Sequence, residues 1–419
     1  MKPVTEYATT VCTARIDQSA ITHNVRVLAA QIAPATLMAV VKADAYGHGI
    51  AHVVPAALAG GVRDFGVATV PEALQLADLL GELAAAGTPG AAEARILAWL
   101  YDVGTDLAEA VAAGIELALP GAWALGPIIA AGRTAGVVPR VHLKCDTGLG
   151  RNGFTPEQLA AFLPALSALD AAPAAGTPAA GADVTGAPLR IVGIMTHLAK
   201  ADEPGDPATA EQLEVFEAFI GRIRSLLEAH PGLGAADELD IHAANTPGAL
   251  ALDPFPGTMA RVGLGIYGLS PFPEETPADL GLRPAMSLRS RVLTVKEVAA
   301  GHGASYGYMY RAPQDTRFAL VAGGYADGIP RTVSGRAEVL IGGRRYPQVG
   351  RIAMDQFIVD LGPADHGVAP GDEAVLFGPD AGAPTADDWA GWAETINYEF
   401  VTCISGRVAR VAGESGEGA

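Results

Sequence analysis

Short apolar runs separated by amphipathic stretches fill the first two thirds of the chain. The runs are blocks of consecutive apolar residues, which is typical of parallel strands covered on both faces. In the first amphipathic stretch Ile21, Val25, Leu28 and Ile32 share one face, after a helix-capping Asp17. Eight strands are predicted, at 37–41, 65–69, 96–100, 115–119, 141–145, 191–195, 239–243 and 260–263.

Eight strands in repeated strand–helix order favour a (β/α)8 TIM-like barrel over an open doubly wound sheet. We predict this α/β barrel for residues 14–275. A proline-rich linker follows at 271–284, and the pattern then alternates apolar and polar residues, which indicates antiparallel strands. We therefore predict a mostly-β C-terminal domain at 276–412, with residues 1–13 packing against it. Its strands are expected within 286–298, 317–325, 337–350, 355–362 and 372–378, with a short helix near 386–392.

One segment, 168–188, is rich in Ala, Pro and Gly and has no periodicity. Such composition is typical of a surface insertion rather than of packed structure. We expect it to be a flexible insertion without a role in chemistry. The last residues, AGESGEGA, are expected to fray.

Charge and cysteine content narrow the function classes. With 28 Lys and Arg against 46 Asp and Glu, the net charge is −18, which argues against binding to nucleic acid or to an anionic membrane. Three scattered cysteines form neither a disulfide framework nor a zinc ribbon and suit a reducing compartment. Neither a signal peptide nor an uninterrupted membrane-length apolar run is apparent. We expect a soluble, cytoplasmic protein.

Polar residues follow several predicted strands at their carboxyl ends, where a barrel carries its active site. Each one alone has an ordinary explanation, such as a surface lysine whose stem lies on apolar neighbours. Their convergence on one rim from different strands favours a functional site. These residues are Lys42, Lys144, Asp146, His197, His242, Asn245 and Arg261.

Lys42 follows five apolar residues directly. Partial burial disfavours the ammonium form and lowers the pKa of a lysine, and a neutral amine can form a Schiff base with a carbonyl. Taken alone, Lys42 can equally be a structural lysine at the barrel rim that is held in a salt bridge.

The segment VVKADAYGHG around Lys42 resembles the pyridoxal-phosphate attachment site of bacterial alanine racemases, which are fold-type III pyridoxal-phosphate enzymes. The resemblance extends from about residue 14 to 410 through ordered motifs. These motifs are HLKCDTGLGRNGF, IMTHLAKAD, HAANTPGAL, RVGLGIYGLSP, SYGYMY, GGYADGIPR, VGRIAMDQ and TINYEFVTCISGR. The resemblance implies interconversion of L- and D-alanine through a pyridoxal-phosphate aldimine, a supply of D-alanine for peptidoglycan, and a homodimer with composite active sites.

The resemblance also implies a role for each matched residue. Lys42 holds the cofactor covalently and is one catalytic base, and Tyr306, supplied by the other subunit, is the second. Arg261 faces the pyridine nitrogen and His197 packs on the cofactor ring. The other implied positions are Tyr46, Asn245, Thr246, Gly263, Leu264 and Tyr398 around the cofactor and its phosphate, Arg151, Met354, Asp355 and Tyr325 for the substrate, and Lys144 as a lysine that is often carbamylated.

These implied roles agree with the needs of racemisation. Pyridoxal phosphate delocalises the electron pair left when a proton leaves Cα, and one base is then needed on each face. A guanidinium keeps its protons, so Arg261 at the pyridine nitrogen donates a hydrogen bond and leaves that nitrogen unprotonated. With an unprotonated ring nitrogen the cofactor is a weaker electron sink, which favours reprotonation of Cα over transamination.

Other functions stay open in the sequence. A related pyridoxal-phosphate racemase of broader specificity, for example for serine, or a decarboxylase shares the architecture, although a decarboxylase should have a carboxylate in place of Arg261. A pyridoxal-phosphate carrier resembles only the first domain. A metal-dependent barrel hydrolase would use His197, His242 and Asp146, but no compact ligand pattern is present, so we predict no metal.

Overall fold

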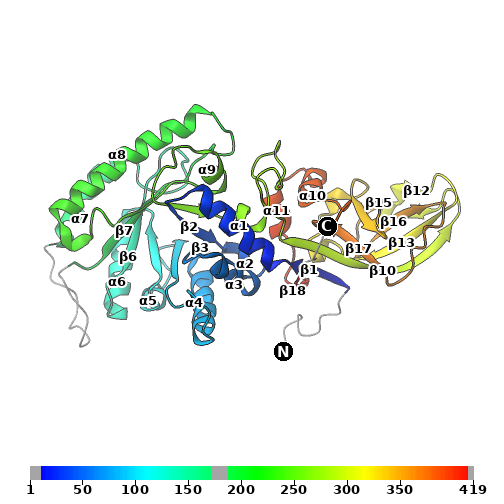
Figure 1. Ribbon diagram of the computed structural model, residues 1–419, viewed down its shortest axis with the longest axis horizontal. Helices are drawn as coiled ribbons and strands as arrows, with labels where there is room; N and C mark the ends of the chain where they lie inside the picture. The colour runs from blue at the N-terminus through cyan, green and yellow to red at the C-terminus, as the bar shows by residue number, and fades with distance from the viewer. Residues whose placement is uncertain (1–10, 171–186, 414–419) are drawn as a thin grey trace.

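The computed structural model describes residues 11–170 and 187–413, which form two domains lying side by side (Figure 1). The predictions for residues 1–10, for most of the insertion at 168–188 and for the tail from 414 lie outside the described residues. Within the described ranges, no helix is long and apolar enough to cross a bilayer.

The first domain contains eight parallel strands in the order β8-β7-β6-β5-β4-β3-β2-β9. The sheet closes because the Arg261 N–H of β9 donates to the Ala244 carbonyl, directly after β8, at 2.9 Å. The strands are β2 (Thr36–Val40), β3 (Asp64–Thr69), β4 (Arg95–Leu100), β5 (Glu116–Leu119), β6 (Arg140–Lys144), β7 (Arg190–Met195), β8 (Asp240–His242) and β9 (Met259–Val262). Each overlaps one predicted run, so the predicted TIM-like barrel is confirmed.

Helices cover the outside of the barrel (Figure 1). The first begins where predicted, because the Asp17 side chain accepts from the Ser19 and Ala20 N–H groups. Its Ile21, Val25 and Leu28 are fully buried. The helices are α1 (Gln18–Gln31), α2 (Lys42–Tyr46), α3 (Ile50–Gly60), α4 (Val70–Ala85), α5 (Ala108–Ala112), α6 (Leu125–Ala135), α7 (Pro156–Asp170), α8 (Pro207–Ala229) and α9 (Thr246–Ala251), with 3-10 turns η2 (Ala122–Ala124), η3 (Pro231–Leu233) and η4 (Leu264–Tyr267).

The second domain is mostly β, as predicted. Its main sheet has the order β13-β16-β15-β14-β17-β10-β1-β18, and β10 also pairs with β13. The elements are β1 (Cys12–Ile16), β10 (Met286–Val298), β11 (Gly303–Ala304), β12 (Tyr310–Arg311), β13 (Thr316–Ala322), β14 (Glu338–Ile341), β15 (Arg344–Val349), β16 (Gln356–Gly362), β17 (Glu373–Phe377), β18 (Ala409–Ala412), α10 (Ala386–Ala393) and α11 (Asn397–Thr402), with η5 (Tyr306–Tyr308), η6 (Tyr325–Asp327) and η7 (Arg331–Val333).

Strand β1 crosses residue 14, the predicted start of the barrel domain. It pairs with β10 and β18, which belong to the second domain. The first described strand therefore belongs to the second domain's sheet, and the chain then builds the barrel and returns to that sheet. The division into 14–275 and 276–412 stays a proposal.

Candidate active site

A cavity of about 760 Å³ lies at the carboxyl ends of the barrel strands, where helix α11 of the second domain faces the barrel. Parallel strands bring their carboxyl ends to one rim, so side chains distant in sequence meet there. From the barrel the cavity is lined by Lys42, Tyr46, Lys144, Arg151, His197, Asn245, Thr246, Arg261, Gly263 and Leu264, and from the second domain by Ile396, Tyr398, Glu399, Thr402 and Cys403, among others. Ten of the predicted barrel positions thus share one cavity with Tyr398.

Lys42 stands at the start of an unusual turn. Residues 43–46 have φ between 49° and 54°, the left-handed region, which costs about 1–2 kcal/mol for each non-glycine residue. Neighbouring groups hold this turn: the Asp44 carboxylate accepts from the Ile50 N–H at 2.9 Å, and the Glu72 carboxylate accepts from the Ala43 N–H at 2.6 Å. These contacts therefore fix the backbone at Lys42, the first residue of α2.

The cationic side chains of the cavity perturb one another. Burial, and then the charges of Arg151 and Arg261, lower the pKa of Lys42, although Glu72 opposes this shift. Burial and the same two arginines lower the pKa of Lys144 to about 8. Both shifts favour the neutral amine. In a chain of net charge −18, these four basic side chains make a local site for anions, in which the two arginines carry the charge.

Arg261 is buried in the cavity floor. Its Nη1 donates to the His242 carbonyl at 2.6 Å and its Nη2 donates to the Thr196 carbonyl at 2.6 Å. Burial lowers its pKa to about 10, so the guanidinium stays charged near neutral pH. The Nη2 atom also lies 3.3 Å from His197 Nδ1, and burial and nearby cations lower the pKa of His197 to about 3. Arg261 is thus a fixed cation beside a neutral imidazole.

Hydroxyl and N–H groups gather at one wall of the cavity. The Thr246 hydroxyl accepts from the N–H groups of Gly263 and Gly265 at 3.2 and 3.3 Å. A Cβ at position 263 would lie 2.3 Å from the Tyr46 hydroxyl, so only glycine lets this tyrosine approach. Burial raises the pKa of Tyr398 to about 12, which keeps it a hydrogen-bond donor. The wall can cradle an anion such as a phosphate.

The predicted cofactor residue Asn245 has a local structural task as well. Its side chain accepts from the Gly248 N–H at 3.2 Å and so caps helix α9. The cap fixes the backbone that carries Thr246.

Four residues of the second domain that were predicted to belong to the site are not among the described residues that line this cavity in their own chain. Tyr306, Tyr325 and Met354 are 70, 45 and 51% exposed. The Asp355 carboxylate pairs with Arg407 at 2.8 Å. Their predicted place in the site of a partner subunit stays a prediction.

Sequence reasoning missed three residues near the site. Glu72 holds the Lys42 turn by accepting a hydrogen bond from the Ala43 N–H, and it also forms a helix capping box with Thr69. Only the capping box has a sequence signal. Trp99 lines the cavity and packs on the methionines of the barrel centre. Asn152 accepts a hydrogen bond from the Lys144 ammonium. The contacts of Trp99 depend on how the barrel strands pack, and the contact of Asn152 with Lys144 depends on the fold of the loop after β6. Neither has a sequence signature.

Comparisons with known proteins agree in both domains. Residues 16–271 match the family described as alanine racemase, N-terminal domain, and residues 285–412 match alanine racemase, C-terminal domain. The alanine racemase of Mycobacterium tuberculosis is 42% identical over 417 residues, which are 99% of each chain. The crystal structure of alanine racemase from Streptomyces coelicolor A3(2) has 43% identity and a TM-score of 0.85, covering 98% of this chain and 100% of that one. The alanine racemase of Bartonella henselae, solved with covalently bound pyridoxal phosphate, has 26% identity and a TM-score of 0.77, covering 96% of this chain and 99% of that one.

Proposed function

The chain belongs to the alanine racemase family, and we propose that it interconverts L- and D-alanine with pyridoxal phosphate held covalently by Lys42. The observation that carries the proposal is the meeting of a lysine of lowered pKa, a buried arginine and a hydroxyl-lined cradle in one cavity. The reaction is a racemisation, an isomerase activity.

The residues of the cavity fit this cofactor. Lys42 supplies the amine for its aldehyde carbon, and Tyr46, Thr246, Gly263, Leu264 and Tyr398 supply donors for its phosphate. Arg261 uses Nη1 and Nη2 for its hydrogen bonds to described residues, which leaves Nε–H for a ring nitrogen. When bound, the cofactor would delocalise the electron pair left at Cα.

Two groups of the protein would move the proton. Lys42 Nζ takes or gives the Cα proton on one face of the substrate, and the Tyr306 hydroxyl of the partner subunit serves the other face. Arg151 would bind the carboxylate of the substrate. The partner subunit would complete the substrate site with its Met354, Asp355 and Tyr325.

We further propose a homodimer, because Tyr306 lies far out on an exposed turn of its own chain. The turn sits between the short strands β11 and β12 and is fixed by the Ser305 hydroxyl, which donates to the Arg351 carbonyl at 2.6 Å. The active site of one protomer is then completed by the other.

A cytoplasmic location and a supply of D-alanine for peptidoglycan complete the proposal. Cys12, Cys145 and Cys403 are free, and the first two are buried, which suits a reducing compartment.

Incubation in deuterium oxide tests the proposed activity. We expect wild-type protein to place deuterium at Cα of both L- and D-alanine and to drive either enantiomer to a racemic mixture, as mass spectrometry and chiral chromatography would measure. Serine and larger amino acids, assayed in parallel, define the breadth of the site, and release of carbon dioxide would indicate a decarboxylase. Protein that carries pyridoxal phosphate yet leaves the Cα proton of alanine in place would contradict the proposal.

Lys144 is proposed to react with carbon dioxide. A neutral amine attacks the carbon, Nζ loses one proton to solvent, and the resulting carbamate would pair with Arg151. A pKa of about 8 keeps enough neutral amine at mildly alkaline pH. We expect 13C-labelled bicarbonate to give a carbamate signal by NMR. That signal should vanish in Lys144→Ala, and KM for alanine should rise about 3- to 10-fold because Arg151 loses an orienting partner.

Lys200→Ala is the matched control, because Lys200 is only partly buried and already pairs with Glu203 and Asp206 at 3.2 and 2.7 Å. A carbamate signal that survives Lys144→Ala would refute the assignment.

A further inference from the structure

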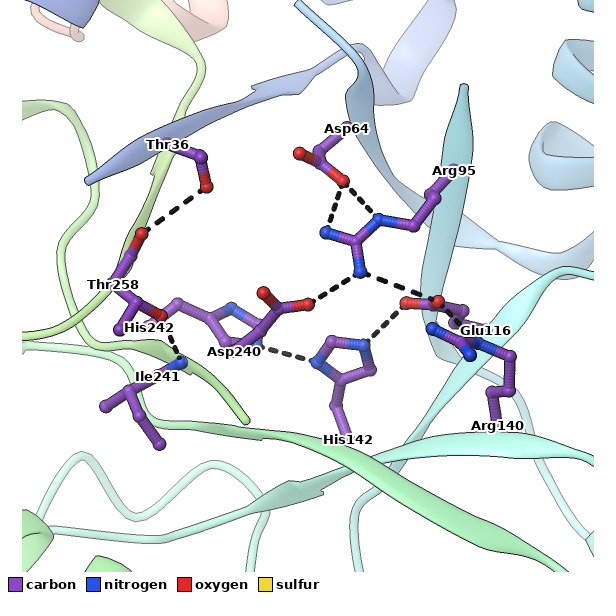
Figure 2. A network of polar contacts seen from close by, with 10 residues as sticks. All are labelled: Thr36, Asp64, Arg95, Glu116, Arg140, His142, Asp240, Ile241, His242 and Thr258. Atoms are coloured by element: carbon purple, nitrogen blue, oxygen red, sulfur yellow. Dashed lines mark hydrogen bonds and ion pairs between the residues drawn. The ribbon is translucent and has the colours of Figure 1, made fainter. Parts of the chain in front are cut away.

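A chain of hydrogen bonds runs through the barrel interior below the cavity, and most of it is drawn in Figure 2. His142 on β6 lies at its centre: its Nε2 is 2.7 Å from the Glu116 carboxylate on β5, and its Nδ1 is 2.8 Å from His242 Nε2 on β8. His242 Nδ1 then lies 3.1 Å from Arg261 Nη1. Two imidazoles thus join a carboxylate to the cavity arginine.

The direction of these hydrogen bonds follows from their two ends. A guanidinium only donates and an ionised carboxylate only accepts. Arg261 therefore donates to His242 Nδ1, His242 Nε2–H donates to His142 Nδ1, and His142 Nε2–H donates to Glu116. Both imidazoles are then neutral and carry their proton on Nε2, and each bond polarises the next.

The position of the Arg261 guanidinium depends on this chain of hydrogen bonds. All of its hydrogen bonds to described residues go to carbonyl oxygens or imidazole nitrogens, so no carboxylate touches this buried cation. Glu116 is anchored at the other end, where its Oε1 accepts from Arg140 Nε at 2.8 Å and lies 3.8 Å from Arg95 Nη1. Side chains this deeply buried hold a single geometry only when each polar atom has a partner.

We propose that Glu116 and His142 are positioning residues for the reaction. They fix the tautomer of His242, so that its Nδ1 accepts from Arg261 and holds the guanidinium against the cavity. The proposal deepens the proposed function and rests on it, because it concerns how Arg261 is presented to the bound ring.

The charges of the buried groups agree with this assignment. Burial raises the pKa of Glu116, but the hydrogen bond from His142 and the charges of Arg95 and Arg140 outweigh it and lower the pKa to about 2, so the carboxylate is ionised. Burial, and then the charge of Arg261, lower the pKa of His242 well below its usual value, so it is neutral.

The same region has the spacing of a cation site, since ligand atoms of Glu116, His142 and Asp240 lie within 4.8 Å of one another. Arg95 already occupies this role: its guanidinium bonds Asp240 at 2.8 Å and Asp64 at 2.6 Å (Figure 2). A divalent cation would have to displace this arginine. A relay of hydrogen bonds from Glu116 through His142 and His242 to Arg261 therefore explains these buried groups better than a metal site does.

Glu116→Gln tests the proposal with little change in shape. The arginines at Oε1 hold the new amide oxygen, which turns its NH2 group toward His142 Nε2. That atom must then accept, so both imidazoles shift their proton to Nδ1, and His242 Nδ1–H faces Arg261 donor to donor. In the 15N-histidine-labelled holoenzyme we expect two imidazoles to change tautomer by NMR. We also expect kcat to fall about 10- to 100-fold with KM for alanine nearly unchanged, and the visible absorbance of the cofactor to shift.

Asp64→Asn is the matched control, because it removes a carboxylate from Arg95 at the same end of the barrel without touching either imidazole. It should leave both tautomers and kcat within about twofold of wild type. An equal loss in Asp64→Asn, or unchanged tautomers in Glu116→Gln, would overturn the proposal. Should Glu116→Gln fail to fold, the wild-type spectrum decides alone, because protons on Nδ1 of His142 and His242 contradict the relay. Absence of alanine racemisation in wild-type protein would instead refute the proposed function, which separates the two failures.

Discussion

Lys42→Ala is expected to abolish alanine racemisation, with a loss of about 10³-fold or more, because it removes the side chain that we propose as both the covalent anchor and one base. Wild-type holoenzyme treated with borohydride should carry the cofactor on the peptide that contains Lys42, and peptide mapping by mass spectrometry would locate it. The variant should release its cofactor on gel filtration and lose the visible absorbance band. The expected size of the effect reflects two roles in one side chain.

Lys296→Ala is the control for this experiment, since Lys296 is an exposed residue of β10 outside the cavity. It should retain cofactor and activity. If borohydride fixed the cofactor to another lysine, such as Lys144, the assignment of Lys42 would be wrong.

Tyr306→Phe is expected to slow racemisation by about 10²–10⁴-fold while the cofactor stays bound. We propose that Lys42 acts on the D-face of Cα and Tyr306 on the L-face, as the resemblance to alanine racemases implies. The variant should therefore lose deuterium exchange at Cα of L-alanine far more than exchange at Cα of D-alanine, where Lys42 still acts. Mass spectrometry of the two enantiomers in deuterium oxide measures this asymmetry. Equal loss for both would argue against a two-base mechanism.

Tyr308→Phe is the matched control, because Tyr308 lies in the same short turn and is also exposed. Its activity should stay close to that of wild type. If Tyr306→Phe were as active as Tyr308→Phe, Tyr306 would have no role in the reaction.

Mixing Lys42→Ala with Tyr306→Phe protein tests whether sites are shared. In a hybrid dimer, one site has lost both groups and the other has both. Equal mixing with free subunit exchange should restore about a quarter of wild-type activity in a symmetric dimer. No recovery after verified exchange would show that each chain supplies both bases itself.

Much of the fold could be predicted because both domains obey simple local rules. Continuous apolar blocks located all eight barrel strands, since strands buried on both faces have no polar side. The alternation of apolar and polar residues located the segment 337–350, which forms the β14–β15 hairpin. The pairing of β1 with β10 and β18 had no such signal, because strand partners far apart in sequence are chosen by the completed sheet.

The candidate site divides in the same way. Strand ends were enough to bring Lys42, His197 and Arg261 to one rim, because the barrel geometry does so for any sequence. The left-handed turn after Lys42 and its support by Glu72 were not predictable, since alanine and tyrosine do not favour positive φ. The link from Glu116 to Arg261 crosses four strands and exists only in the closed barrel.

The place of β1 has a consequence for how the protein is made. This strand leaves the ribosome well before its partners, because its antiparallel partner begins at Met286 and its parallel partner at Ala409. At about 5–20 residues per second, the wait is on the order of tens of seconds, during which the barrel can already fold. Until then an unpaired strand edge stays available to other nascent chains. Chain order and assembly order therefore differ here, because a strand synthesised before the barrel finds its neighbours only after the barrel has been made.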